Sequence, residues 1–375
     1  MIDLKGAAFL LVAIAAGCGG KVSESASDTF EVTIPDGSAV ALIVRDSIGI
    51  AEGDSDYVMG GVEGAAFGPD GNIAVLDCAR GTVRIYSPRG EFLRSVGRRG
   101  SGPGELGNVT SMAVTESGSI QLAGAGGDEY GIHSFDYFTG EWISSIRTFV
   151  PPSCLEAAWG DRYLRKDISF EVRGDEIYLP VTVSLYEAGM EEPCIVFHSD
   201  TVLFDPTKEV ELLELDWYGY DIAADRGGTV YIAPRSTHEA EVMVFDSSGC
   251  RLRTLVLPYE PVERTSDELE MERNILRAKA IASNESPEGL EPDPFKPTIR
   301  GLEVDGDGNL WILQGGPSTP TFSVVSPEGD FLYTAVVEGD PSDGSTWRFH
   351  IGEEGMLAYA EDPLCGYQKI YLLDR

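Results

Sequence analysis

The sequence predicts an all-β fold, a six-bladed β-propeller with one helical insertion. Three observations support this prediction: a hairpin pattern recurs six times, a second hairpin follows most copies, and one stretch between copies lacks strand alternation. The clearest copy is FGPDGNIAVLD, in which two apolar runs flank a turn. The turn glycines of the six copies are Gly71, Gly118, Gly174, Gly228, Gly308 and Gly355.

Glycine is expected in these turns because tight hairpins require positive φ angles. Repeats of roughly 40 to 55 residues, each with four short strands, are typical of propeller blades. The last copy stops after its third strand, KIYLLDR, and the segment AVALIVRDSIGI, residues 39–50, can supply the fourth. We therefore expect the N-terminal strand to pair with the C-terminal blade, which closes the ring and removes two open sheet edges.

The insertion lies between the fourth and fifth blades, at about residues 262–290. Its sequence TSDELEMERNILRAKAIA, residues 265–282, has no strand alternation, and Thr265 with Glu268 fits a capping box. Apolar residues recur along one side of this segment. A single helix is predicted there.

The N-terminus has the pattern of an export signal over residues 1–17. Lys5 precedes an apolar run, residues 7–16, that is too short for a comfortable membrane span. Small residues then precede Cys18, which resembles the lipobox of bacterial lipoproteins. The resemblance implies that Cys18 is acylated, that residues 18–37 form a polar tether, and that Gly19 directs the protein to the outer membrane. A simple secretory signal with an incidental cysteine is the alternative.

The charge of the chain restricts its partners. Lys and Arg total 28 against 62 Asp and Glu, which gives a formal net charge of -34. A surface this acidic repels nucleic acid and anionic lipid, so we expect no nucleic-acid partner and membrane contact through the lipid anchor only. It favours cationic partners, or it serves only to keep the protein soluble.

The cysteines suggest one disulfide. Five remain without Cys18, so at least one thiol stays free or pairs elsewhere. An oxidising envelope permits disulfides, and Cys154 with Cys194 is the candidate pair. No cysteines have CxxC spacing, which disfavours a thiolate metal site.

The repeats also resemble a known family. The stretch FGPDGNIAVLDCARGTVRIYSPRGEFLRSVGRRGSGPGEL is similar to an NHL-type repeat. More broadly, the chain resembles bacterial six-bladed β-propeller lipoproteins of the NHL and TolB-like kind over roughly residues 39–375, and we place the propeller domain at residues 38–375. This resemblance implies the fold much more firmly than a function, because propellers serve as enzymes, binding platforms and scaffolds.

The function expected first is a lipid-anchored binding or scaffold module of the bacterial envelope. Its ligand would be an envelope protein, a peptide or a glycan, bound at the end of the ring that carries the long loops. Candidate residues on this binding face are Arg80, Arg98, Arg235 and His238; alternatively, these are solvated rim groups. We assign no catalytic residue and no cofactor, since no GxSxG, HExxH or other nucleophile arrangement occurs.

An alternative function is a calcium-dependent, lactonase-like hydrolase with a metal at the channel mouth. Glu63, Asn108 and Asp221 stand at or just before the starts of innermost strands in three blades. Oxygen ligands from separate blades suit Ca²⁺, as in the calcium-dependent lactonases that share this fold. A bound Ca²⁺ there would polarise a carbonyl group. Three such placements can also arise by chance in so acidic a chain.

Overall fold

A computed structural model describes most of the chain. The described residues are 28–34, 39–102, 104–126, 129–148, 154–169, 171–174, 176–204, 219–282, 288–289, 291–317, 319–338, 347–361 and 366–374. The expected signal, Cys18 and most of the expected tether lie outside the described residues.

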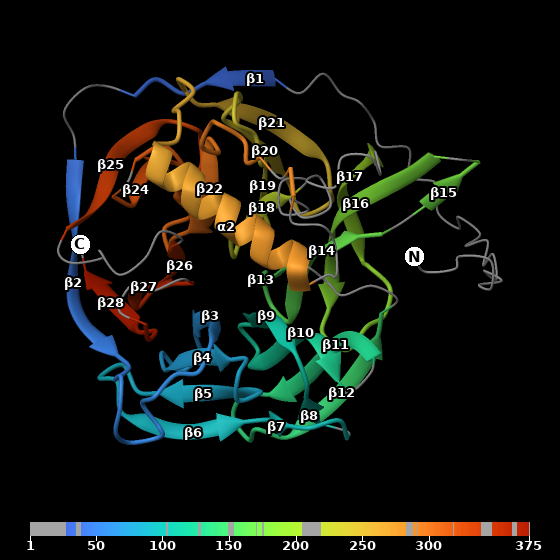
Figure 1. Cartoon of the computed structure of the whole chain (residues 1–375), viewed down its shortest axis with the longest axis vertical. Helices are drawn as coiled ribbons and strands as arrows, with labels where there is room; N and C mark the ends of the chain where they lie inside the picture. The colour runs from blue at the N-terminus through green and yellow to red at the C-terminus, as the bar shows by residue number, and fades with distance from the viewer. Residues whose placement is uncertain are drawn as a thin grey trace.

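The described strands form five large sheets arranged radially about a centre, the arrangement of a β-propeller (Figure 1). The first two sheets each contain four consecutive strands in a meander. One consists of β3 (Val62–Phe67), β4 (Ile73–Asp77), β5 (Thr82–Tyr86) and β6 (Phe92–Val96). The other consists of β9 (Val109–Val114), β10 (Ser119–Gly126), β11 (Glu129–Asp136) and β12 (Trp142–Arg147). Between them lies a small parallel pair, β7 (Arg98–Arg99) and β8 (Glu105–Leu106).

The next two sheets each carry an additional strand. The third sheet contains β13 (Cys154–Ala157), β14 (Arg162–Ile168), β15 (Glu171–Arg173), β16 (Glu176–Glu187) and β17 (Ile195–Phe204), with β15 and β17 both on β16. The fourth contains β18 (Tyr220–Ala224), β19 (Val230–Pro234), β20 (Glu241–Phe245), β21 (Arg251–Val256) and β1 (Asp28–Glu31). Thus β1, within the segment expected to be a tether, pairs in parallel with β21.

The fifth sheet has eight strands and contains the closure of the ring. Its order is β22 (Ile299–Val304), β23 (Leu310–Gln314), β24 (Thr321–Val325), β25 (Phe331–Glu338), β2 (Ala39–Ile48), β28 (Ile370–Asp374), β27 (Gly355–Ala360) and β26 (Trp347–Gly352). The expected pairing of the N-terminal strand is confirmed, since β2 runs antiparallel to β28 from Ile43–Asp374 to Ile48–Ile370. The first half of β2 also pairs in parallel with β25, which was not expected. The six predicted blades therefore do not form six separate sheets, because β2 joins the strands of the last two into one sheet.

One strand of each repeat lies nearest the centre. These innermost strands are β3, β9, β13, β18, β22 and β26, and each contacts the next around a closed cycle. The apolar cores lie between neighbouring sheets; one cluster, for example, combines Val242 and Tyr231 with Ile312 and Leu302. Because apolar burial occurs between sheets, the space enclosed by the innermost strands is free for polar side chains.

The turn glycines follow the predicted pattern with one correction. Gly71, Gly118, Gly228, Gly308 and Gly355 have positive φ angles in the innermost hairpins. Gly174 instead lies between β15 and β16, outside the innermost hairpin of its sheet, and Gly160 occupies the turn between β13 and β14. Gly160 and Gly174 both have positive φ and lie between two strands, so the local sequence pattern could not show which of the two hairpins is the innermost one.

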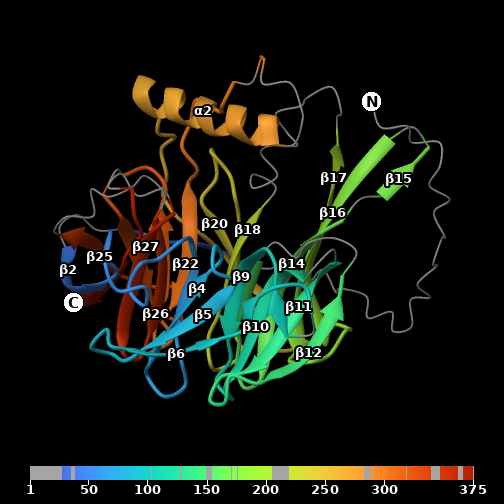
Figure 2. The same cartoon turned by 60° about the horizontal axis from the view of Figure 1, so that its bottom comes forward.

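The predicted insertion is the helix α2 (Ser266–Ala282), which crosses one face of the ring in front of its centre (Figure 1). Its capping box is formed: the Thr265 backbone N–H donates to Glu268 Oε2 at 2.8 Å, and the Glu268 N–H donates to Thr265 Oγ1 at 3.3 Å. Turned by 60°, the molecule shows α2 standing above one end of the strands (Figure 2). Among the described residues, α2 included, no helix has the length and apolarity needed to cross a membrane.

The closure by β2 gives a stability prediction. Leu42 is 1% exposed in the core between β25 and β28, whereas the adjacent Ile43 is 55% exposed. We expect Leu42→Ala to lower the free energy of unfolding by about 2–5 kcal/mol, the usual cost of a buried leucine. Ile43→Ala, the matched control on the opposite face of the strand, should cost much less. Equal losses in denaturant titrations would show that β2 does not close the core.

Candidate functional site in the central channel

The innermost strands enclose two cavities along the axis of the ring. The mouth cavity, about 230 Å³, is lined by the beginnings of these strands at the end over which α2 lies. The turn cavity, about 630 Å³, is lined by the innermost turns at the opposite end. The residues that line both cavities, which we call the waist, are Val114, Glu156, Ala157, Glu303 and His350.

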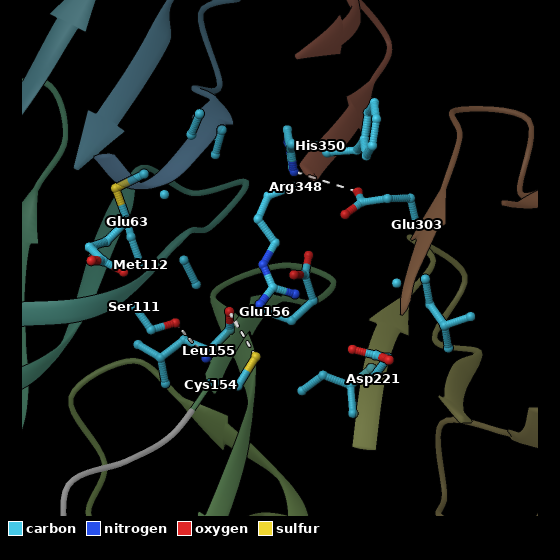
Figure 3. A pocket seen from close by; sticks show the side chains of 18 of the residues that line it. Glu63, Ser111, Met112, Cys154, Leu155, Glu156, Asp221, Glu303, Arg348 and His350 are labelled. Carbon is cyan, nitrogen blue, oxygen red and sulfur yellow. Dashed lines mark hydrogen bonds and ion pairs between the residues drawn. The ribbon is translucent and has the colours of Figure 1, made fainter. Parts of the chain in front are cut away.

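Strand alternation explains which side chains face the channel. Side chains two residues apart on a strand point to the same side, so Arg348 and His350 of β26 share one face, with His350 one step deeper. Cys154 and Glu156 are related in the same way on β13. Figure 3 shows Arg348 reaching into the pocket, with carboxyl groups of Glu156, Glu303 and Asp221 also facing it.

The mouth cavity has an unusual charge for so acidic a chain. Four basic side chains line it, and five carboxyl groups do so as well. The basic residues are Lys166, Arg235, Arg300 and Arg348, and the acidic residues are Glu63, Glu156, Asp221, Glu303 and Glu361. The state of each carboxyl group therefore decides the net charge of the cavity.

Asp221 is the acid most firmly held in its ionised form. It is buried on β18, and its Oδ1 lies 3.1 Å from Arg235 Nη2. Burial acts to raise the pKa of Asp221, but the charge of Arg235 and the hydrogen bond from it outweigh burial and lower that pKa. Asp221 and Arg235 thus form a pair that neutralises itself.

Among the described residues, the Arg348 guanidinium is hydrogen-bonded through Nε but not through its two Nη atoms. Its Nε lies 2.6 Å from Glu361 Oε1. Burial opposes the charge of Arg348, but the Glu361 carboxylate outweighs burial and raises the pKa of the guanidinium. Among the described residues, Nη1 and Nη2 of Arg348 make no hydrogen bond. Two donors of a planar guanidinium therefore face the cavity.

The waist carries two carboxyl groups that favour the protonated form. Burial raises the pKa of Glu156 to about 8. Burial, together with the nearby Glu156, raises the pKa of Glu303 well above its usual value. Burial also lowers the pKa of His350 to about 4, so its imidazole is neutral at pH 7 where it lies 3.8 Å from Glu303. At pH 7 the waist thus presents the protonated carboxyl group of Glu156 and the neutral imidazole of His350, each of which can donate and accept hydrogen bonds.

The three predicted calcium ligands are not all brought together. Glu63 and Asp221 line the mouth cavity, whereas Asn108 does not and is exposed just before β9. Burial and the nearby Glu361 raise the pKa of Glu63, which accepts a 3.7 Å contact from the Cys78 thiol. Within the described part of the chain, no three His, Cys, Asp or Glu side chains form a metal-binding group.

Of the four residues predicted for the binding face, Arg235 alone lines the mouth cavity. Arg80 donates to the Val58 carbonyl oxygen and lies 3.6 Å from Asp77. Arg98 is largely exposed and pairs with Glu105 at 2.7 Å. His238 is exposed, with its ring centroid 5.6 Å from that of Phe295, in the segment that returns from α2 to the ring.

The predicted disulfide between Cys154 and Cys194 is wrong, since both thiols are free. Cys154 lies on β13 and Cys194 directly precedes β17, with β14 and β16 between these strands. Neighbouring strands are about 4.8 Å apart, so three such spacings exceed the limit of about 7 Å between bridged Cα atoms. Burial instead raises the pKa of Cys154, which faces the mouth cavity.

The most distinctive channel residues were not predicted as site residues. Glu156 was overlooked because the third repeat was placed on the hairpin at Gly174 instead of the one at Gly160. Arg348 and Glu303 lie on correctly placed innermost strands, and charged residues at channel-facing positions of such strands are the signal that identifies them.

Comparisons with known proteins support the fold alone. No protein-family model matches the chain, and no curated protein matches it. A putative exported protein from Bacteroides fragilis aligns with TM-score 0.51 and 12% identity, covering 92% of this chain and 98% of that one. A β-propeller domain from Myceliophteria thermophila gives TM-score 0.44 and 10% identity, with coverages of 87% and 98%. Regucalcin, a calcium-binding protein from Agrobacterium tumefaciens, aligns with TM-score 0.43 and 12% identity, covering 88% of this chain and 94% of that one.

The raised pKa of Glu156 predicts a pH dependence. Because its folded-state pKa of about 8 exceeds the ordinary 4.5, the stability gained from protonation is complete at low pH and is lost as pH rises from about 4.5 to 8. The glutamine of the Glu156→Gln variant stays neutral at every pH. The free energy of unfolding of this variant minus that of the wild type should therefore increase by at least about 1 kcal/mol between pH 4.5 and 8. Urea titrations at several pH values measure this difference in the free energy of unfolding, and the Glu354→Gln variant, changed at an exposed residue, is the control. A pH-independent difference would show that Glu156 is ionised in the folded protein.

Proposed function

We propose that the protein is an exported binding module, a six-bladed β-propeller of the NHL and TolB-like kind anchored to the envelope through Cys18. The blade count treats the eight-stranded sheet as two blades, β22–β25 and β26–β28 with β2. The closed cycle of contacts among the innermost strands supports this count. The lipobox-like sequence before Cys18 supports the anchor.

One observation supports binding at the α2-bearing face: every innermost strand contributes to a single charged cavity there. A pocket built by all repeats of a rigid ring is preformed, and preformed concave pockets with a few polar groups are typical ligand sites. The partner is an envelope protein, a peptide or a glycan that reaches this face. The loops at 233–240 and the helix α2 flank the mouth cavity and are the expected contact regions.

Capture from envelope extract tests this function. We expect the wild-type protein to retain a partner, and a variant combining His238→Ala with replacement of residues 265–282 by a short glycine–serine linker to lose it. The matched control is Asp307→Ala with Glu354→Ala at the opposite end of the ring, which should keep the partner. Thermal melting establishes that each variant is folded. Equal capture by all three proteins would contradict the choice of face.

The anchor gives a separate prediction. We expect Cys18→Ser to move the protein from the membrane fraction to the soluble fraction, because a serine cannot take the thioether-linked lipid. The measurement is fractionation of cells followed by immunodetection, with Cys78→Ser as the control. If the Cys18→Ser protein stays with membranes, another part of the chain holds it there.

The calcium-dependent hydrolase remains the second candidate, favoured by Glu63 and Asp221 lining one cavity. Asp221 is already paired with Arg235, and basic side chains of the same cavity repel a divalent cation. We therefore expect millimolar Ca²⁺ to shift the melting temperatures of wild type and Glu63→Ala equally. A stabilisation that Glu63→Ala abolishes would instead favour the metal-dependent enzyme.

A further inference from the structure

We infer that the mouth cavity binds the carboxylate of a small polyhydroxylated acid, such as a uronic acid, and that the Nη atoms of Arg348 are its principal donors. This inference rests on the proposed function and specifies the ligand class of the same face. Four features of the cavity support it: its net charge, the open guanidinium of Arg348, the crowding of cations around Arg300, and its size.

The net charge of the mouth cavity favours an anion. Glu156, whose pKa is raised to about 8, is mostly protonated at neutral pH, which leaves four basic side chains facing at most four carboxylates. The raised pKa values of Glu303 and Glu63 reduce the negative charge of the cavity further. The chain as a whole has a formal charge of -34. Four basic side chains gathered inside so acidic a protein make this cavity the place where a small anion is attracted locally.

Arg348 supplies the directional contact. Its Nε is fixed 2.6 Å from Glu361 Oε1, which holds the guanidinium over the channel. The remaining Nη1 and Nη2 have no hydrogen-bond partner among the described residues. A planar guanidinium binds a carboxylate through two parallel N–H···O bonds, and a fixed guanidinium loses little freedom on doing so.

Arg300 shows that positive charge is crowded at the same point. Burial and the nearness of Arg348, Arg235 and Arg264 lower the pKa of Arg300, and the nearby Glu361 only partly opposes this shift. The charge of Arg235 is balanced by Asp221 at 3.1 Å. A ligand carboxylate beside Arg348 would add negative charge next to these guanidinium groups, so binding is favoured by both the new contacts and the weaker repulsion among the cations.

The size and the floor of the cavity define the rest of the ligand. A cavity of about 230 Å³ is slightly below the range of roughly 300–1,000 Å³ that is usual for small-molecule sites, which suits a single sugar-sized unit and excludes a folded peptide. The waist presents the carboxyl groups of Glu156 and Glu303, both with raised pKa values, and the neutral imidazole of His350, and the wall of the mouth cavity adds the Ser111 hydroxyl. Such groups exchange hydrogen bonds with ligand hydroxyls.

The experiment titrates glucuronate into the full-length Cys18→Ser protein by calorimetry, with glucose and glycylglycine as matched probes. Glucose has the hydroxyls without the carboxylate, and glycylglycine has the carboxylate without the hydroxyls. We expect glucuronate to bind at least about tenfold more tightly than either, because hydrogen bonds to charged groups are the stronger ones. Equal binding of glucose, tighter binding of glycylglycine, or no binding of glucuronate would overturn the inference.

Two variants identify the donor. Arg348→Gln should weaken glucuronate binding at least about tenfold, and Arg348→Lys, which keeps the charge and loses the two-pronged geometry, should give an intermediate value. The control is Arg226→Gln, which removes a guanidinium of the turn cavity and should leave binding unchanged. Melting curves show whether each variant is folded. Unchanged affinity in a folded Arg348→Gln protein would exclude Arg348 as the anchor.

Failure of this inference is distinguishable from failure of the proposed function. If the wild type captures an envelope partner through the α2-bearing face but does not bind glucuronate, the ligand class is wrong and the face is right. If glucuronate binds and no face-dependent capture occurs, the site is present and the role as an envelope-partner module is wrong.

Discussion

The structure depends on the pairing of β2 with two strands at once. The second half of β2 completes the sheet that ends the chain, and the first half lies along β25 of the sheet before it. A radial array of sheets is stable only when each sheet packs on two neighbours and no long edge remains exposed. By joining the last two groups of strands, β2 fixes the circumference of the ring and with it the diameter of the channel.

Closure of the ring explains the chemistry of the channel. Apolar side chains are buried between sheets, and the innermost strands turn their other positions toward the axis, where polar and charged side chains line the cavities. Charged groups in such a confined place must pair, lose their charge or await a ligand. All three outcomes occur: Asp221 pairs with Arg235, Glu156 and Glu303 favour protonation, and Nη1 and Nη2 of Arg348 make no hydrogen bond within the described part of the chain. The cavity is therefore polar and preformed.

Much of the fold could be predicted from the sequence because its signals are local. Glycines in tight turns, the capping box at Thr265 and the missing strand of the last repeat each depend on a few neighbouring residues. The third sheet was harder because two glycine hairpins, at Gly160 and Gly174, lie in succession and have similar patterns. The disulfide prediction failed because sequence separation carries no information on how many strands lie between two cysteines. The unexpected pairing of β2 with β25 likewise depends on three-dimensional placement.

The site was less predictable because it too depends on the three-dimensional placement of distant residues. Glu63 and Asp221 were predicted from their positions at strand starts and Arg235 from its place in a long loop, and all three line the mouth cavity. Their roles could not be inferred, because a pair such as Asp221 with Arg235 is settled by side-chain distances. Glu156 and Glu303 lie on strands far apart in sequence, and only the closed ring brings the two carboxyl groups to one waist.

Hydrogen–deuterium exchange followed by mass spectrometry tests the closure of the ring most directly. Peptides covering residues 39–48 should exchange as slowly as those covering 370–374, because amides of both strands are held in one sheet and open only when the ring opens. Fast exchange over residues 39–48 together with slow exchange over 370–374 would contradict closure by β2. In that case, the channel and its cavities would not have the fixed geometry from which the binding site is inferred.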